Sequence, residues 1–312
     1  MKKVRFALLF IAFNLILVFL LTRIDHVFKN KSVSGAQELF AKWNPEHADI
    51  VFIGNSHNFC TISTDLLYDE YGIESFMLAT SAQTIPMSYY AAMEAIELKH
   101  PDKIVLEISY VPHEYLTIGS GMDHCFFDDM PNCRAKKLAL EDLIDSSERI
   151  YYVLPLGYYH SRWRELHKED YEDTALSDRG TFTNNRMEDS LENIPVVPEG
   201  EEQPIPEITE DYLLKIFDLC KENNTELILY AAPFGSTDPN KYSEEILFNS
   251  QRCFNYVCRI AKEHGIRAYN LFYELDGLEL IYGTDWMDRQ HLNLFGQEKV
   301  TRYMADKGYF SD

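Results

Sequence analysis

The stretch Asp49–His57, with the sequence DIVFIGNSH, decides the fold. A short apolar run ends there in Gly-Asn-Ser-His, and an apolar run of this length bounded by turn residues is typical of a buried strand. Gly54 permits a tight turn, so Ser56 falls where a following helix would begin. That position lies at the carboxyl edge of a sheet, where open α/β folds bind ligands, and in the field of a helix N-terminus. The alternative is that Ser56 only caps the helix, because serine is a preferred N-cap residue.

A second polar stretch, Asp285–Asn293 with the sequence DWMDRQHLN, precedes the last expected helix. Asp288 stands three residues before His291, so its carboxylate can orient that imidazole within one loop. A hydroxyl nucleophile needs a base, and the base needs an acceptor on its other nitrogen to fix the tautomer. Ser56, His291 and Asp288 supply one of each. The two stretches together therefore predict a Ser-His-Asp triad.

Strand and helix patterns alternate from residue 48 onward. Strands are expected at 48–53, 74–78, 103–108, 226–232 and 268–271, and helices at 64–71, 87–99, 207–223, 242–264 and 296–307. Such alternation predicts an α/β fold with a parallel sheet and helices on both faces. No internal repeat interrupts the pattern.

Both polar stretches resemble the conserved blocks of the SGNH/GDSL hydrolases. Ile53–Ser56 is similar to their first block, with Asn55 where many members have Asp, and Asp288–His291 is similar to their last block. The closer likeness is to a membrane-anchored, cell-envelope branch, similar to the alginate O-acetylation proteins and the D-alanyl transfer protein of teichoic acid systems. It covers roughly residue 48 to the C-terminus, apart from an insertion at about 112–206. The resemblance implies a flavodoxin-like, three-layer α/β/α fold with a five-stranded parallel sheet.

The resemblance also draws attention to two further turns. Ser81-Ala82-Gln83 occupies the position of the second block, normally a Gly whose backbone N–H helps to hold an oxyanion, and Ala82 or Gln83 could donate equally well. An ordinary turn is the alternative. The third block normally supplies an Asn, but Ser109–His113 contains none. Losing one such donor costs about 3 kcal/mol of transition-state stabilisation, so an active protein needs a substitute.

The insertion contains a polar-aromatic cluster, Tyr158–Trp163. An Arg between aromatic residues can bind a carboxylate, a phosphate or an oxyanion. We therefore predict that Arg162 lies beside the Ser56 pocket and replaces the missing contact. The alternative is a helix in which the aromatic residues pack while Arg162 pairs with Glu165. Residues 192–210, rich in proline and acids, are expected to form an extended linker.

Six cysteines are present, without a Cys-x-x-Cys pair or a Cys/His spacing that would indicate zinc. Cys125 and Cys133 flank a short polar loop and are expected to be bridged if the compartment is oxidising. The other four lie among apolar residues and are expected to be buried thiols. No phosphate-binding Gly-rich loop is present, so no metal or cofactor is expected.

The N-terminus resembles a membrane anchor. Met1–Arg5 is basic, and Phe6–Thr22 is a run of 17 residues that is apolar except for Asn14 and Thr22. A cleaved signal peptide is the alternative, but no small-x-small cleavage motif follows the run. We expect an uncleaved anchor with its basic flank at 1–31 and an extracytoplasmic hydrolase-like domain at 32–312. Basic residues flank both ends of the run, so the orientation is taken from the family likeness and the large folded remainder.

The charge of the chain excludes one class of partner. Of the 29 basic and 50 acidic residues, residues 1–31 hold six Lys/Arg and one Asp. Residues 32–312 therefore carry 23 basic and 49 acidic residues, a net charge of −26. Such a surface is repelled by nucleic acid.

Two functions of different kinds fit these features. The first is a serine esterase or O-acyltransferase acting on acyl groups of a cell-envelope polysaccharide, with a membrane-bound acyl-donor protein as a further partner. The second is a catalytically inactive protein of the same fold that binds glycan or scaffolds an envelope acylation complex. The intact Ser, His and Asp favour the enzyme, whereas the missing third-block Asn favours the scaffold. Fold alone does not decide between them.

Overall fold

Five parallel strands form the centre of the molecule, in the order β2-β1-β3-β4-β5. The computed structural model describes residues 2–30, 48–113, 121–128, 130–171, 177–188, 195–234 and 244–311. The strands are β1 (Ile50–Gly54), β2 (Ser75–Ala79), β3 (Lys103–Glu107), β4 (Glu226–Ala231) and β5 (Arg267–Asn270). This is the flavodoxin-like order, in which the winding direction switches at β1. The predicted fold class is confirmed.

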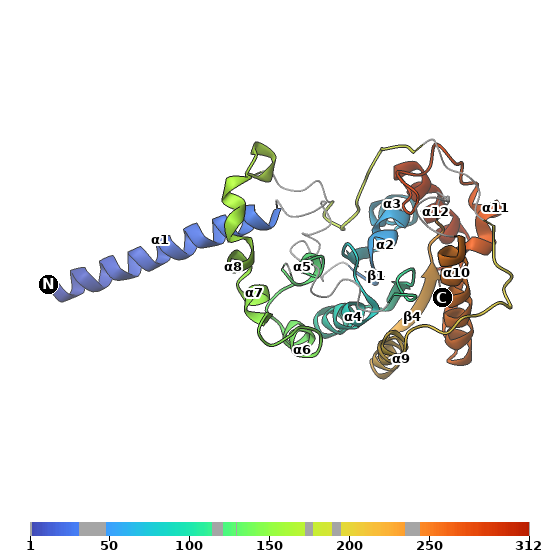
Figure 1. The fold of residues 1–312 in the computed structure, drawn as a ribbon, viewed down its shortest axis with the longest axis horizontal. Coiled ribbons are helices and arrows are strands. Elements are labelled where there is room, and N and C mark those ends of the chain that lie inside the picture. The colour runs from blue at the N-terminus through green and yellow to red at the C-terminus, as the bar shows by residue number, and fades with distance from the viewer. Residues whose placement is uncertain are drawn as a thin grey trace.

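Helices cover both faces of the sheet (Figure 1). Alternate residues of β1 point to opposite faces, so Val51 and Ile53 belong to one apolar cluster and Ile50 and Phe52 to the other. The first cluster contains residues of α4 (Ile85–Lys99), α6 (Arg134–Leu143), α9 (Glu207–Glu222) and α10 (Glu244–Glu263). The second contains residues of α2 (Ser56–Thr61), α3 (Thr64–Tyr71), α11 (Leu275–Leu278) and α12 (Leu294–Asp306). Both faces of the sheet are thus shielded from water, as parallel sheets require.

The expected strands and helices lie within two residues of their predicted bounds, although residues 242 and 243 of one expected helix lie outside the described part of the chain. Cap residues explain this agreement. The Ser63 hydroxyl accepts the Leu66 N–H at 3.2 Å and starts α3, and Thr84 does the same for α4. The short helix α2 was not expected as a separate element.

The insertion is folded against one side of the sheet domain. It contains α5 (His124–Phe127), α6, α7 (Arg149–Val153), α8 (Pro155–Tyr159) and the 3₁₀ helices η2 (His160–Arg164) and η3 (Lys168–Tyr171). The described part of the expected linker, 195–206, has no helix or strand and leads into α9. A further 3₁₀ helix, η4 (Leu271–Glu274), follows β5.

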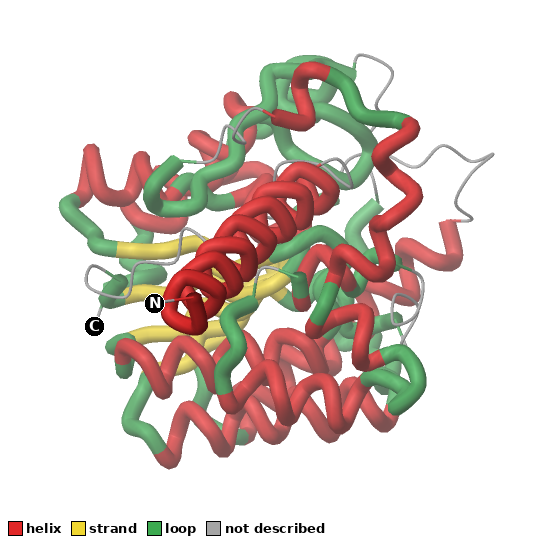
Figure 2. Tube along the Cα trace, turned by 90° about the vertical axis from the view of Figure 1, so that its left-hand side faces the viewer, coloured by secondary structure: helices red, strands yellow, loops and turns green. Residues whose placement is uncertain are grey.

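The N-terminal helix α1 (Lys2–Asn30) projects from the side that the insertion occupies (Figure 1), and Figure 2 looks onto that side. Among the described residues, α1 is the one helix long and apolar enough to cross a membrane. Its domain end packs on the insertion, where Val27 and Phe28 form a small apolar cluster with Tyr159. Helix α1 and the insertion are therefore in direct contact.

The expected bridge between Cys125 and Cys133 is absent, and neither residue forms a disulfide. Cys125 is enclosed in α5 and only 1% exposed. The sulfur of Cys133 instead accepts the Lys136 N–H at 3.3 Å, which caps α6. This prediction failed because closeness in sequence across a loop does not bring two side chains face to face. Cys60, Cys220 and Cys253 are buried as expected, and Cys258 is partly buried.

Candidate active site

Ser56 occupies the first turn after β1, and its neighbours fix the turn. Gly54 has a φ of +156°, and a Cβ there would lie 2.9 Å from the Cβ of Glu107, so both conformation and space require glycine. Asn55 caps α2, because its Oδ1 accepts the His57 N–H at 2.8 Å. The interpretation of Ser56 as the N-cap is therefore wrong. Asn55 caps the helix, and the hydroxyl of Ser56 remains available for another contact.

That contact is His291, which arrives from the far end of the chain. The Ser56 Oγ lies 2.8 Å from the His291 Nε2, and the His291 Nδ1 lies 3.0 Å from each oxygen of Asp288. With the Nδ1 proton donated to the carboxylate, Nε2 is free to accept from the serine hydroxyl. The hydrogen-bond chain predicted from the sequence is present. The catalytic role of these three residues stays a prediction.

The loop that carries Asp288 and His291 is held at several points. The buried Asp285 accepts the ammonium of Lys299 and the Ile281 N–H, each at 2.7 Å. Asn293 caps α12 through its Oδ1 and donates from its Nδ2 to the Thr284 carbonyl at 2.6 Å. These contacts fix both ends of the loop, so the imidazole is placed by the fold before any ligand binds.

Asp288 is held in its charged form. Burial raises the pKa of this carboxyl, but the imidazole of His291 and the backbone N–H groups of Gln290 and His291 outweigh burial, and the pKa lies below its usual value. Those two N–H groups donate to Oδ1 at 2.8 and 2.9 Å. A charged acceptor on Nδ1 stabilises the imidazolium that forms when His291 takes a proton.

His57, which follows the candidate nucleophile, was not predicted to be a site residue. Its ring stacks on that of His291, with centroids 4.8 Å apart, and lies 4.9 Å from the ring of Phe234. Burial lowers the pKa of His57 well below its usual value, and the nearby His291 adds to the effect. A neutral, fully packed imidazole therefore supports one face of His291. The adjacency of Ser56 and His57 in the sequence was the available signal.

Glu107, also missed, connects three turns beneath the site. It ends β3, is 1% exposed, and accepts the Ser109 N–H at 2.9 Å and the Ala232 N–H at 3.3 Å. Burial raises the pKa of Glu107 to about 7, although hydrogen bonds from Ser109, Ala232 and Asn55 oppose the increase. The residue thereby joins the turns after β1, β3 and β4. A charged residue at the end of the apolar strand IVLE was its sequence signal.

The two predicted oxyanion donors differ in their surroundings. The Gln83 N–H is bonded to the Thr80 carbonyl at 3.2 Å, and the Gln83 Oε1 accepts the Thr80 N–H and hydroxyl, each at 3.0 Å. Gln83 therefore closes the turn, and its N–H is committed there. Ala82 has a φ of +56°, a left-handed conformation that costs a non-glycine residue about 1 kcal/mol or more. Such strain is common at functional turns, and Ala82 stays the predicted donor.

The loop after β3 supplies no direct replacement for the missing third-block Asn through Ser109, because its hydroxyl is bonded to Glu107. A further polar side chain of this loop, His113, lies close to the site. Burial lowers the pKa of His113, and His113 lies near enough to His57 to help lower the pKa of that residue. Like His57, it was not predicted to be a site residue.

Arg162 does not lie where it was predicted. Its guanidinium donates to the Phe28 carbonyl at 2.6 Å and stacks 3.8 Å from the centre of the Tyr159 ring. Phe28 is in the last turn of α1, where carbonyls lack helical partners and the helix dipole favours a cation. The α8 end of the insertion lies away from α2 in Figure 1. Arg162 therefore caps α1 and does not bind at Ser56, and Glu165 is not its partner in that contact.

A second His–Asp pair lies in the insertion. The His124 Nδ1 is 2.8 Å from Asp128, and both side chains are 3% exposed. The imidazole is stacked between Tyr152 and Tyr158, with centroids 4.2 and 3.9 Å away. Asp128 also accepts the Tyr159 hydroxyl at 2.5 Å. This pair is sealed by aromatic rings, whereas His291 and Asp288 are 18% and 43% exposed.

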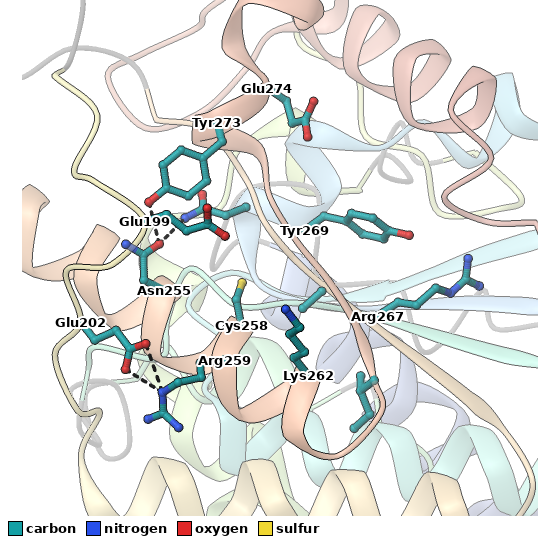
Figure 3. A pocket seen from close by; sticks show the side chains of 13 residues that line it. Glu199, Glu202, Asn255, Cys258, Arg259, Lys262, Arg267, Tyr269, Tyr273 and Glu274 are labelled. Carbon is teal, nitrogen blue, oxygen red and sulfur yellow. Dashed lines mark hydrogen bonds and ion pairs between the residues drawn. The ribbon is translucent and has the colours of Figure 1, made fainter.

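A large cavity is present elsewhere in the molecule. It has a volume of about 710 Å³ and lies between α10, β5 and the segment that precedes α9 (Figure 3). Acidic and basic side chains are mixed along its wall, and Glu202 is bonded to Arg259 there at 2.8 Å. Ser56, His291 and Asp288 do not line it. Its size alone does not connect it with the hydrogen-bond chain described above.

Comparison with known proteins adds little to this geometry. No family model and no curated protein matches the sequence. One of the solved structures that do match is titled "Crystal Structure of TesA", with 10% sequence identity, a TM-score of 0.40, and coverage of 83% of this chain and 97% of that one. The fold class therefore rests on the strand order, and any conclusion about chemistry rests on the side chains of this chain.

Proposed function

We propose that this chain is a serine esterase or O-acyltransferase that acts on acyl groups of cell-envelope polysaccharide. The hydrogen-bond chain from Ser56 through His291 to Asp288 carries the proposal. It unites a hydroxyl, a base and a charged acceptor at the carboxyl edge of a parallel sheet, which is where open α/β folds bind ligands.

Each residue has one task in the proposed reaction. The His291 Nε2 takes the proton of Ser56 as the Oγ bonds to the acyl carbon, and Ala82 donates its N–H to the oxyanion. The tetrahedral intermediate then loses the alcohol, which takes the proton back from Nε2 and leaves an acyl-serine. Water or a sugar hydroxyl next gives a proton to Nε2 and attacks the acyl carbon, and Ser56 leaves with that proton. Asp288 stabilises the imidazolium in both halves of the reaction.

The choice of an envelope substrate rests on α1 and on the family likeness. A helix long enough to cross a membrane holds the domain near one surface, which suits a substrate fixed in the same envelope. The net charge of −26 in residues 32–312 suits a domain that binds neutral acylated sugars better than nucleic acid. We place the domain on the outer side of the membrane. If the reaction is acyl transfer and not hydrolysis, we propose a membrane-bound protein as the acyl donor.

The test is covalent labelling of the full chain by a fluorophosphonate, together with release of acetate from an acetylated polysaccharide. Wild type is expected to be labelled and Ser56→Ala is not. Ser63→Ala is the matched control, because it removes a helix-capping serine in the same region and costs about 1 kcal/mol of stability. The control should be labelled like wild type.

The alternative, an inactive scaffold or glycan-binding subunit, is favoured by the loop after β3, where Ser109 is occupied by Glu107 and no Asn is present. Under this alternative wild type resists the label and releases no acetate, yet binds the polysaccharide. If Ser56→Ala is labelled and turns over as fast as wild type, the enzyme proposal at this site is wrong.

A further inference from the structure

The uninterrupted apolar run of α1 is shorter than the candidate span, which extends from Lys3 to Phe28. At 1.5 Å per residue, the 17 residues from Phe6 to Thr22 span about 25 Å, whereas a bilayer core is about 30 Å thick. The basic residues Lys3 and Arg5 precede the run, so extra apolar length is absent at that end. The helix continues beyond Thr22, so the last part of the bilayer core, about 5 Å, lies beside the residues that follow the run at the domain end.

The insertion places apolar side chains at that depth. A groove of about 520 Å³ is lined by Leu21, Thr22 and Asp25 of α1 and by residues 153–157 of α7 and α8. Val153 and Leu154 are 49% and 61% exposed, although they are aliphatic. Because they share the groove with Leu21, they stand level with the end of the apolar run.

More exposed apolar residues continue along the same segment. Ile150, Tyr151, Tyr158 and Trp163 have between 43% and 61% of their surface exposed. Scattered exposed apolar residues are ordinary, but these occur within one stretch beside a candidate membrane helix. Tyrosine and tryptophan are the residues that prefer the level of lipid headgroups.

The charge of this segment differs from that of the domain. Residues 149–168 hold four Lys/Arg and one Glu, a net charge of +3, within a domain of net charge −26. Basic side chains next to a membrane helix are attracted to anionic phospholipid. Arg164 lies over the ring of Trp163 at 5.0 Å, which joins the cationic and aromatic components at one point.

We propose that α7, α8 and η2 form a second membrane contact, in which Val153, Leu154 and Trp163 enter the headgroup–acyl boundary of the bilayer that α1 crosses. This proposal rests on the anchoring role given to α1 above. Figure 1 shows why the two fit together: α7 and α8 lie on the side of the domain from which α1 projects. The contact adds to the docking of α1 on the insertion in setting the tilt of the domain at the membrane.

The test uses the full chain in vesicles that contain anionic phospholipid and acyl-brominated phosphatidylcholine, a tryptophan quencher. A Trp43→Phe background removes a tryptophan outside the described residues, and Trp286 is fully buried. Trp163 is expected to lose most of its emission to the brominated lipid. In a Trp163→Phe background, Leu154→Trp should restore the quenching. Phe295→Trp, at a position 46% exposed on α12, should be quenched by aqueous iodide and not by the lipid.

A charged side chain placed in the proposed membrane contact should weaken it. Leu154→Glu should reduce lipid quenching of Trp163, whereas Leu98→Glu, at an exposed position at the end of α4, should leave it unchanged. Flotation reports α1 separately, because α1 is intact in every variant. Floating protein whose Trp163 is not quenched by lipid would overturn the second contact, including the case in which a protein partner covers this face. Protein that does not float would overturn both the contact and the anchor, whatever the outcome of labelling at Ser56.

Discussion

Two His–Asp pairs in this chain have nearly the same geometry and opposite surroundings. The His291 Nδ1 lies 3.0 Å from Asp288, and the His124 Nδ1 lies 2.8 Å from Asp128. The first imidazole offers its Nε2 to a serine at the edge of the sheet, whereas the second is enclosed between two tyrosine rings. A pair of this kind is a candidate for catalysis only when a nucleophile and an opening accompany it. Otherwise it contributes to a folded core.

The sharpest test of this difference exchanges each histidine for alanine. His291→Ala should reduce kcat by about 10⁴-fold or more, because the members of a triad act as a unit. His124→Ala should leave turnover of the folded protein near the wild-type value and lower its stability, since it leaves a cavity and removes one of the hydrogen bonds to the buried Asp128. Steady-state kinetics and urea unfolding of both variants measure the two effects. A large loss of kcat in folded His124→Ala would remove the distinction.

The next largest effect on turnover is expected from neutralising the acid of the first pair, Asp288, and not that of the second, Asp128. Asp288→Asn should slow turnover by about 10³- to 10⁴-fold with little change in the fold, on the pattern seen when a triad acid loses its charge. Asp128→Asn should affect the melting temperature and not kcat, because Asp128 accepts hydrogen bonds from His124 and Tyr159 inside the insertion. Equal kinetics for Asp288→Asn and wild type would contradict the role given to Asp288.

Substitution of Glu107 tests how the turns beneath His291 and Asp288 are held together. Its pKa of about 7 in the folded chain exceeds the ordinary 4.5, so its protonated form is the one that folding favours. The stability that it contributes is complete below pH 4.5 and is lost as the pH rises through 7, by about 3 kcal/mol. Glu107→Gln cannot ionise, so its stability relative to wild type should increase between pH 5 and pH 8. Parallel unfolding curves across that range would count against this explanation.

Substitution of Arg162 should have the smallest effect on turnover. It tests the packing of the insertion on α1. Arg162→Ala should leave kcat at the Ser56 site within about twofold and should cost about 1 to 2 kcal/mol, from the lost contacts with Phe28 and Tyr159. Hydrogen exchange in the last turn of α1 should become faster. Arg162→Lys keeps the charge but loses the planar stack, so its stability should lie between those of wild type and Arg162→Ala. A variant with impaired turnover and unchanged exchange would restore the original placement of Arg162 near Ser56.

The sheet and the pair of Asp288 and His291 could be predicted because their sequence signals are local. The run Ile50–Ile53 is apolar and ends at a glycine, and Asp288 is three residues from His291. Parallel topology then brings the two ends of the chain to one edge. Arg162 was misplaced because its partner is a carbonyl 134 residues away, and no periodicity encodes such a contact. The role of Glu107 depends on burial by three strands, which likewise becomes visible only in the folded chain.

The contact between Arg162 and the Phe28 carbonyl also sets an order of events during synthesis. At about 5 to 20 residues per second, on the order of ten seconds separate the appearance of Phe28 from that of Arg162, 134 residues later. Helix α1 therefore emerges long before the arginine that caps its last turn. Docking of the insertion on α1 is therefore a late step, possible only after half of the chain exists.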